Sequence, residues 1–267
     1  MKAYYAIFKL RLVNGMQYRV AALAGIATQL FFGLVFIMVL IAFYRYSNAD
    51  MPISLSELTA YIWLQQAFLS FIMLWFRDNE LFQLITTGNI AYELCRPTDI
   101  YGFWFAKLLA QRLASAMLRC MPVIVIAMLL PDPYRLTLPP EPINLLLFVV
   151  TLLLGLLILV AISMFIYIMT FVTMSPTGSL LMFSVLGEFL SGLTVPVPLL
   201  PTWLQTIIYA LPFRWSGDFP FRVYSGHIPT EEALAGIPLQ LLWLTVLVLG
   251  GANAMRRALR RVVVQGG

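Results

Sequence analysis

The chain has 267 residues, of which 61% are hydrophobic and only 11% are charged. This composition, together with a mean hydropathy of +0.88, excludes an ordinary soluble domain and indicates an integral membrane protein. The formal net charge of +5 does not indicate a nucleic-acid partner, because the basic residues are not gathered on one soluble face. We therefore expect an all-α protein embedded in a lipid membrane.

The first 19 residues mix four cations with aromatic and aliphatic side chains. Their charges do not form one clean sector of a helical wheel, so we predict an interfacial helix whose cations snorkel to the membrane surface. This segment is not a secretory signal, because the apolar run that follows is too long and no small-residue cleavage pattern comes after it.

The rest of the chain contains six long apolar segments, which predict six transmembrane helices. At about 1.5 Å per residue, a helix needs about 20 residues to cross a hydrocarbon core about 30 Å thick. Asp99 is expected to cap the third span, and the fourth is long enough that it must tilt or protrude. The predicted spans are residues 20–44, 58–76, 103–130, 143–174, 178–193 and 237–254.

Prolines interrupt the apolar region between the fifth and sixth spans. Pro196, Pro198 and Pro201 crowd the part that follows Gly192, where a continuous helix cannot persist. Residues 193–215 are too hydrophobic for a solvated loop. We predict short re-entrant helices that dip into the outer leaflet, where protein covers their backbone.

The basic residues predict the orientation. In the six-span arrangement, twelve Lys/Arg fall on one side and four on the other. By the positive-inside rule, the first side is the cytoplasm, and both termini are then cytoplasmic.

The segment from Arg77 to Arg112 follows the second span and contains charged residues along its whole length. Asp78 or Asn79 can cap a short helix there, and Gly88 can end it. We expect the apolar stripe of this helix to be exposed and to dock in a groove on a partner. The alternative is a helix that lies in the inner headgroups. The stripe consists of Leu81, Phe82, Leu84 and Ile85.

Several short motifs resemble the ABC-2 type transporter permeases. The pattern Gly88-x-Ile90-x-x-x-Leu94-x-Arg96-Pro97 follows the second span, and the proline-broken region contains Ser191-Gly192, Leu200-Pro201-x-Trp203 and Leu211-Pro212-Phe213. The likeness covers nearly the whole chain, from the interfacial helix through the first cytoplasmic loop to the re-entrant region. It implies one ABC-2 transmembrane domain over residues 1–267, in a multi-pass protein of the bacterial cytoplasmic membrane.

The resemblance also implies partners and a substrate path. An ABC exporter subunit of this kind works with a second permease, identical or homologous, and with two copies of an ATPase that carry ATP and Mg²⁺. The short helix after the second span would be the coupling helix. Spans two and five of the two permeases would face each other around the path of an amphipathic or hydrophobic substrate such as a drug, a peptide antibiotic or a lipid-like molecule. The path would be lined by Phe68, Phe71, Met182 and Phe189.

No catalytic or metal-binding constellation is visible in the sequence. The phosphate-binding pattern G-x-x-x-x-G-K-[ST] is missing, so ATP hydrolysis is expected on a separate chain. Cys95 and Cys120 lie in different environments and do not indicate a disulfide or a zinc site. His227 is the single histidine and is expected to be solvated.

Two charged residues fall deep in predicted spans. Arg119 and Glu188 both come near the membrane midplane by the rise of a helix, where an unpaired charge costs at least about 2.5–3.5 kcal/mol. One hypothesis is that they pair. The alternative is that Arg119 snorkels inward, while Glu188 is protonated or bonded to Ser184 or Ser191.

A second functional class also fits an apolar multi-span chain. A stand-alone ion-coupled secondary carrier or channel would bind ions through intramembrane charge and commonly carries an internal repeat. We find no repeat between residues 1–130 and 131–267. A membrane-embedded enzyme would need a set of catalytic groups that this sequence does not supply.

Overall fold

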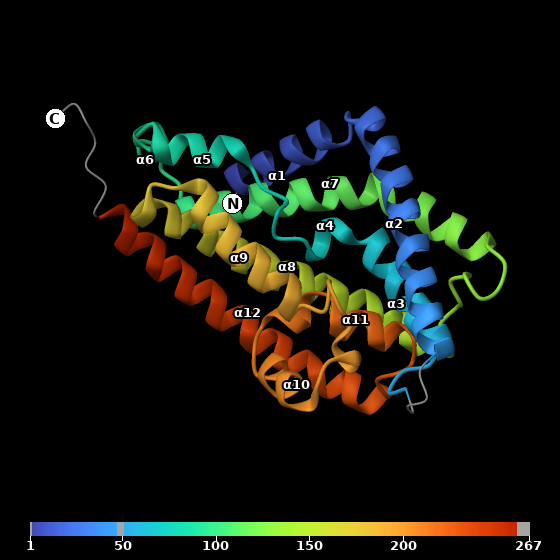
Figure 1. The fold of residues 1–267 in the computed structure, drawn as a ribbon. Helices are drawn as coiled ribbons and strands as arrows, with labels where there is room; N and C mark the ends of the chain where they lie inside the picture. The colour runs from blue at the N-terminus through green and yellow to red at the C-terminus, as the bar shows by residue number, and fades with distance from the viewer. Residues whose placement is uncertain (1, 47–50, 261–267) are drawn as a thin grey trace.

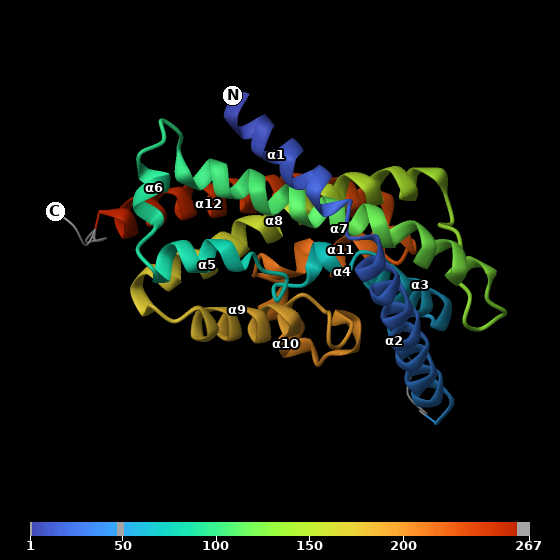
Figure 2. The same ribbon diagram turned by 90° about the horizontal axis from the view of Figure 1, so that it is seen from above.

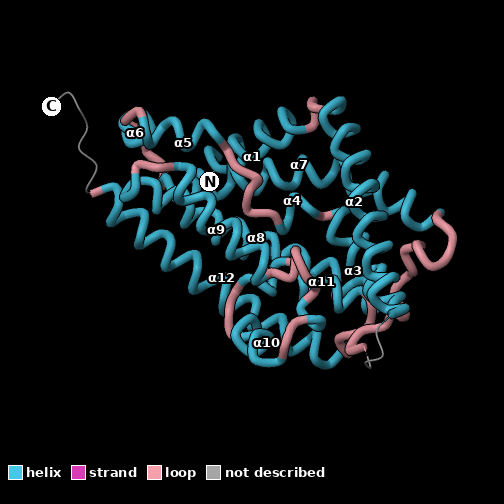
Figure 3. Tube along the Cα trace, viewed as in Figure 1, coloured by secondary structure: helices cyan, strands magenta, loops and turns pink. Residues whose placement is uncertain are grey.

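The computed structural model describes residues 2–46 and 51–260, and these residues form helices joined by loops, with no strand among them (Figures 1 and 3). The helices of the first half are α1 (Lys2–Gly15), α2 (Arg19–Tyr46), α3 (Leu55–Ala67), α4 (Leu69–Ile72), α5 (Asn79–Thr86), α6 (Ile90–Leu94) and α7 (Ile100–Leu129). Those of the second half are α8 (Pro142–Thr173), α9 (Pro176–Leu190), α10 (Thr202–Tyr209), α11 (Asp218–Tyr224) and α12 (Thr230–Leu259), with the 3₁₀ turns η1 (Val197–Leu199) and η2 (Phe213–Ser216).

Four helices, α2, α7, α8 and α12, are long and apolar enough to cross a membrane. They correspond to the predicted spans at 20–44, 103–130, 143–174 and 237–254. Asp99 caps α7 as expected, because its carboxylate accepts a hydrogen bond from the Gly102 N–H at 2.8 Å. The all-α prediction is therefore confirmed for the described residues.

The predicted second span differs from expectation, whereas α9 lies close to the predicted fifth span at residues 178–193. The helical part of residues 58–76 breaks at Phe68 and ends at Ile72, so the prediction of one continuous span there is wrong. The 13 residues of α3 give a helix about 20 Å long, and the 15 residues of α9 give about 22 Å, both short of a core about 30 Å thick. A run of apolar residues in the sequence indicates that the segment is buried, but it does not determine the residue at which the helix ends.

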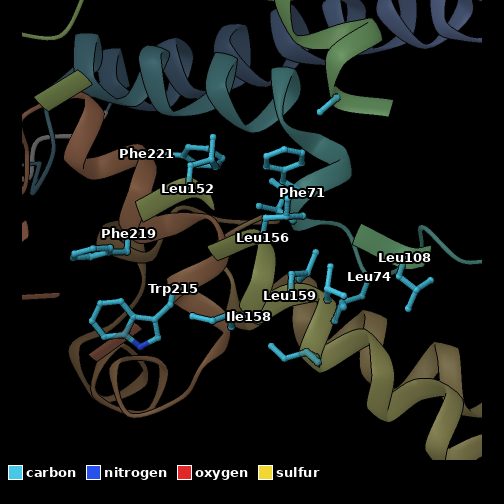
Figure 4. Packing of buried hydrophobic residues seen from close by; sticks show 14 of the residues in the cluster. Phe71, Leu74, Leu108, Leu152, Leu156, Ile158, Leu159, Trp215, Phe219 and Phe221 are labelled. Carbon is cyan, nitrogen blue, oxygen red and sulfur yellow. The ribbon is translucent and has the colours of Figure 1, made fainter. Parts of the chain in front are cut away.

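The core of the bundle is built around α8. Figure 4 shows Leu152, Leu156 and Leu159 of this helix with Phe71 and Phe221 on one side and Trp215 on the other. Every residue of α11 is buried, and α11 packs against both α8 and α3. The segment just before α12 therefore contributes a helix to the interior of the bundle. The predicted re-entrant region, residues 193–215, ends before α11 and contains η1, α10 and most of η2, and only Ile208 of α10 is buried.

The two ends of the bundle carry different elements. In Figure 1, α5, α6 and the C-terminal end of α12 lie at one end, and α10 lies at the other with the start of α12. The Asp99 N–H donates to the Tyr4 hydroxyl at 3.1 Å, which places the start of α1 beside the start of α7. The first and last described residues therefore lie at the same end of the bundle as α5 and α6.

Helix α2 stands apart from the other long helices. It packs mainly against α3 and α7, and Figure 2 shows its far end projecting from the bundle. Most of its large apolar side chains are exposed, as expected for a helix that faces lipid or another membrane protein.

A close approach between α8 and η2 generates the first prediction. A Cβ atom added at Gly155 would lie 2.7 Å from the Trp215 carbonyl oxygen, whereas one added at Gly250 on α12 would meet only a Phe165 ring atom at 3.9 Å. Because the obstacle at Gly155 is backbone, Gly155→Ala should lower the free energy of unfolding by about 1–3 kcal/mol. Gly250→Ala should leave it unchanged or raise it slightly.

Thermal unfolding of both variants in the same detergent measures the difference. Equal midpoints for the two variants would contradict the close packing of α8 on η2.

Candidate functional site

The exposed end of the bundle contains a short capped helix, α5, in the segment that sequence analysis singled out. The Asp78 carboxylate accepts a hydrogen bond from the Glu80 N–H at 2.9 Å, so Asp78 caps α5 as predicted. Gly88, with a φ of +76°, follows the last turn, where a residue without a side chain adopts the left-handed conformation at little cost.

The apolar stripe of α5 faces the bundle and not a partner. Leu81, Phe82 and Ile85 are buried within this chain, and Leu84 is half-buried. The Phe82 ring packs on the Tyr167 ring of α8, with 4.7 Å between their centroids. The prediction that this stripe is exposed for docking is therefore wrong, because α8 already covers it.

A polar network fastens α5 to three other helices. The Lys107 ammonium of α7 lies 3.3 Å from the Asp78 carboxylate and 3.0 Å from that of Glu80. Arg11 of α1 also pairs with Glu80, and the Asp78 N–H donates to the Tyr167 hydroxyl of α8 at 2.8 Å. The side chain of Lys107 is almost fully buried, so its charge depends on these two carboxylates.

Burial and the neighbouring cations shift the pKa of Glu80 in opposite directions. Partial burial alone would raise the pKa, but the hydrogen bonds and charges of Arg11 and Lys107 lower it below its usual range. Glu80 therefore stays ionised near neutral pH, and its contribution to stability is lost only as the pH falls through this lowered pKa.

A second buried cation, Arg112, holds the segment that connects α4 to α5. Its guanidinium donates to the carbonyl oxygens of Ser70 at 2.8 Å, Met73 at 2.9 Å and Phe76 at 3.1 Å, and to the Ser163 hydroxyl at 3.0 Å. The acceptors include carbonyls at the broken end of the predicted second span, which have no helical partner. The guanidinium thus ties that end to α7 and α8.

Sequence analysis missed this role of Lys107 and Arg112. It counted them as cytoplasmic charges, because the whole segment from Arg77 to Arg112 was assigned to the loop between the second and third spans and the periodicity of a helix does not show which neighbours surround it. Their position inside one long helix, between apolar residues, was the available signal.

The outer surface of α5 and α6 is open. Exposed polar residues of α5 and of the loop before α7 lie next to two exposed large apolar residues of α6, Tyr92 and Leu94, which are 73% and 43% exposed. Arg96 forms a surface ion pair with Glu93 at 3.0 Å. We call this surface the α5–α6 face. It consists of Gln83, Thr86, Thr87, Asn89, Tyr92, Leu94, Cys95 and Arg96.

The residues expected along a substrate path fall in two different environments. Phe71 is buried, and Phe68 is packed against Phe71 and Phe148 with ring centroids 5.6 and 5.8 Å apart. Within this chain, α7, α8 and α11 pack around the predicted second span, and the role of Phe68 and Phe71 in a path between two permeases stays a prediction. Met182 and Phe189 of α9 are 45% and 40% exposed and remain accessible on the bundle surface.

The two charges that were predicted to lie deep in the membrane, Arg119 and Glu188, do not meet. No ion pair joins Arg119 to Glu188 within residues 2–46 and 51–260. Arg119 lies against Gly25 of α2, whereas Glu188 is on α9, which packs on α8 and η2. The predicted pairing is therefore wrong, since equal depth in a membrane does not place two side chains on facing helices.

The surroundings of Glu188 do not match the alternative hydrogen bonds either. The Ser191 hydroxyl donates to the backbone carbonyl of Glu188 at 3.3 Å, and one carboxylate oxygen of Glu188 and the Ser184 hydroxyl are both buried without a partner among the described residues.

Comparison with known proteins gives one match that covers most of the chain. The family described as "ABC-2 family transporter protein" matches residues 32–266. No curated protein and no solved structure matches the chain significantly.

The network beneath α5 generates the second prediction. Lys107→Met should lower the free energy of unfolding by about 3 kcal/mol, because it leaves the buried Asp78 carboxylate without its cation. It should also speed hydrogen exchange in residues 79–86, because α5 then loses a link to α7.

Lys9→Met is the matched control, because Lys9 is an exposed cation of α1. Unfolding midpoints and hydrogen–deuterium exchange by mass spectrometry measure both effects. Unchanged exchange in α5 after Lys107→Met would contradict the anchoring role.

Proposed function

The chain belongs to the ABC-2 transporter family, and from this premise we propose that it is the transmembrane permease subunit of an ATP-driven exporter. Apart from the family match, the proposal rests on the way the α5–α6 face is attached to the long helices. An exposed surface at one end of the bundle is joined to α7 through a buried ion pair and to α8 through a hydrogen bond. Such an arrangement suits a subunit that receives force from outside the membrane.

The partner in this proposal is a separate ABC ATPase, present in two copies, which binds ATP and Mg²⁺. It docks on the α5–α6 face and not on the buried stripe of α5. The face combines exposed apolar side chains, Tyr92 and Leu94, with polar groups, a composition typical of protein interfaces. Arg96 adds a charge that selects the orientation of the partner.

Movement of the ATPase reaches the membrane helices by direct contact. A displaced α5 carries Asp78, which is held by Lys107 of α7 and by Tyr167 of α8. The eight residues of α5 are too few for a stable isolated helix. Its structure therefore depends on these contacts, and it moves together with the helices that stabilise it.

The proposed transporter contains two permeases. The exposed apolar side chains of α9, which include Met182 and Phe189, are available to face a second permease or an amphipathic or hydrophobic substrate. In this proposal the chain lies in the bacterial cytoplasmic membrane with both termini in the cytoplasm, and the α5–α6 face lies on the same side.

The docking surface generates the third prediction. Changing Tyr92 and Leu94 together to Ala should reduce copurification of an ABC ATPase at least tenfold and should lower transport by the same order, because interface energy concentrates in a few large side chains. Stability of the permease should be unchanged, since both side chains are exposed.

The matched control changes Tyr46 and Leu138, which are 88% and 73% exposed outside the α5–α6 face. The ATPase is quantified by mass spectrometry after affinity purification of the permease from its own cells. Full transport without any associated ATPase would instead support a solitary ion-coupled carrier.

The orientation generates the fourth prediction. Cys95 is exposed on the α5–α6 face, and the second cysteine, Cys120, is partly buried in α7. In a Cys120→Ser variant, a membrane-impermeant maleimide should label Cys95 in inverted vesicles and not in intact spheroplasts. Labelling of spheroplasts would place the α5–α6 face outside and would contradict the proposed docking of a cytoplasmic ATPase.

A further inference from the structure

A cavity of about 560 Å³ lies where the end of α1 and the start of α2 meet the middle of α7. Its volume falls within the range of small-ligand sites, about 300–1,000 Å³. It is separate from the α5–α6 face and from the exposed side of α9, and the proposed function does not use it.

The lining of the cavity favours an anion. Arg11 and Arg119 contribute two guanidinium groups, and no acidic residue belongs to the lining. Polar groups that can donate hydrogen bonds complete this side of the cavity. They come from Asn14, Gln17, Tyr18, Gln111 and Ser115.

Two of these donors have no fixed acceptor. Arg11 shares its charge with Glu80, but Arg119 forms no ion pair in the part of the chain that the structure describes. The Ser115 hydroxyl, one turn before Arg119 on α7, is buried and also lacks a partner there. A buried donor without an acceptor is costly, so a ligand that supplies acceptor oxygens would stabilise this site.

A glycine makes room for the Arg119 guanidinium. A Cβ atom at Gly25 of α2 would lie 2.7 Å from Arg119 Cζ and 2.8 Å from Nη1. The guanidinium therefore rests on the bare backbone of α2, beside the α1–α2 turn.

The other side of the cavity is apolar. Ala21, Ala22 and Leu118 contribute to the lining, and Val20 and Leu23 in the same first turns of α2 are exposed large apolar residues. A ligand with its anionic group at Arg119 therefore has an apolar surface beside it for hydrocarbon chains.

We infer that this cavity binds the phosphate group of an anionic membrane lipid, with Arg119, Arg11 and Ser115 donating to the phosphate oxygens and the acyl chains lying along the start of α2. Guanidinium groups match the geometry of phosphate oxygens and are weakly hydrated. The bound lipid would hold the α1–α2 turn against α7. The inference stands apart from ATP-driven transport and is tested on the permease alone.

Native mass spectrometry of the detergent-purified chain tests the inference. Phosphatidylglycerol should bind with at least tenfold higher affinity than phosphatidylcholine. Inorganic phosphate should not displace the lipid when it is added at the lipid concentration that saturates the protein. Arg119→Gln should lower phosphatidylglycerol affinity at least tenfold, while Arg119→Lys should restore part of it.

The matched control is Arg257→Gln, which removes one exposed cation of α12 away from the cavity and should leave binding unchanged. Gly25→Ala keeps every charge but displaces the guanidinium, and it should also weaken binding, so the test does not depend on Arg119→Gln folding. Unfolding midpoints are measured for each variant.

Three results would overturn the inference. Equal binding of phosphatidylglycerol and phosphatidylcholine would show that the cavity does not select an anionic lipid. Inorganic phosphate that displaces the lipid at equal concentration would identify a site for free anions. Unchanged lipid affinity in Gly25→Ala and in Arg119→Gln, or an equal loss in Arg257→Gln and Arg119→Gln, would assign binding to general surface charge.

Discussion

The burial of two cations on α7 determines how the α5–α6 end of this protein is joined to its long helices. Moving a guanidinium or an ammonium out of water costs several kcal/mol even after relaxation, and the cost must be offset by fixed partners. Arg112 uses backbone carbonyls of the broken segment after α3, and Lys107 uses the carboxylates at the start of α5. The same two charges therefore require the break in the predicted second span and fix the position of the helix that follows it.

This constraint explains why α8 lies at the centre of the fold. Ser163 of α8 accepts a hydrogen bond from Arg112, and Tyr167, one turn later, accepts one from the Asp78 backbone and supports the Phe82 ring. The polar contacts at one end continue directly into the aliphatic core that Figure 4 shows around Leu156 and Leu159. A displacement of α5 is consequently transmitted to a helix that is packed on several sides, and such a core does not deform gradually.

The sequence predicted well the features that depend on local composition, and it predicted poorly those that depend on which helices pack together. Hydropathy over about 20 residues located four long helices, and the caps at Asp78 and Asp99 followed from local hydrogen bonding. The stripe containing Leu81 and Phe82 was apolar as expected, but periodicity does not say whether α8 or another protein covers it. Likewise, the rise per residue gave the depth of Arg119 but not the direction in which its side chain points.

The contrast between Arg112 and Arg119 shows how one residue type on a single helix acquires two roles. Both lie on α7, in stretches of mostly apolar sequence. Arg112 is surrounded by three carbonyl oxygens and a hydroxyl, all fixed by the fold, so an added ligand would have to displace contacts already made. Arg119 rests on the bare backbone at Gly25 beside an open cavity and an unpartnered hydroxyl at Ser115. Arg119 is only half-buried and forms no ion pair among the described residues, so an anion from the surrounding membrane can bind its guanidinium without displacing an existing partner.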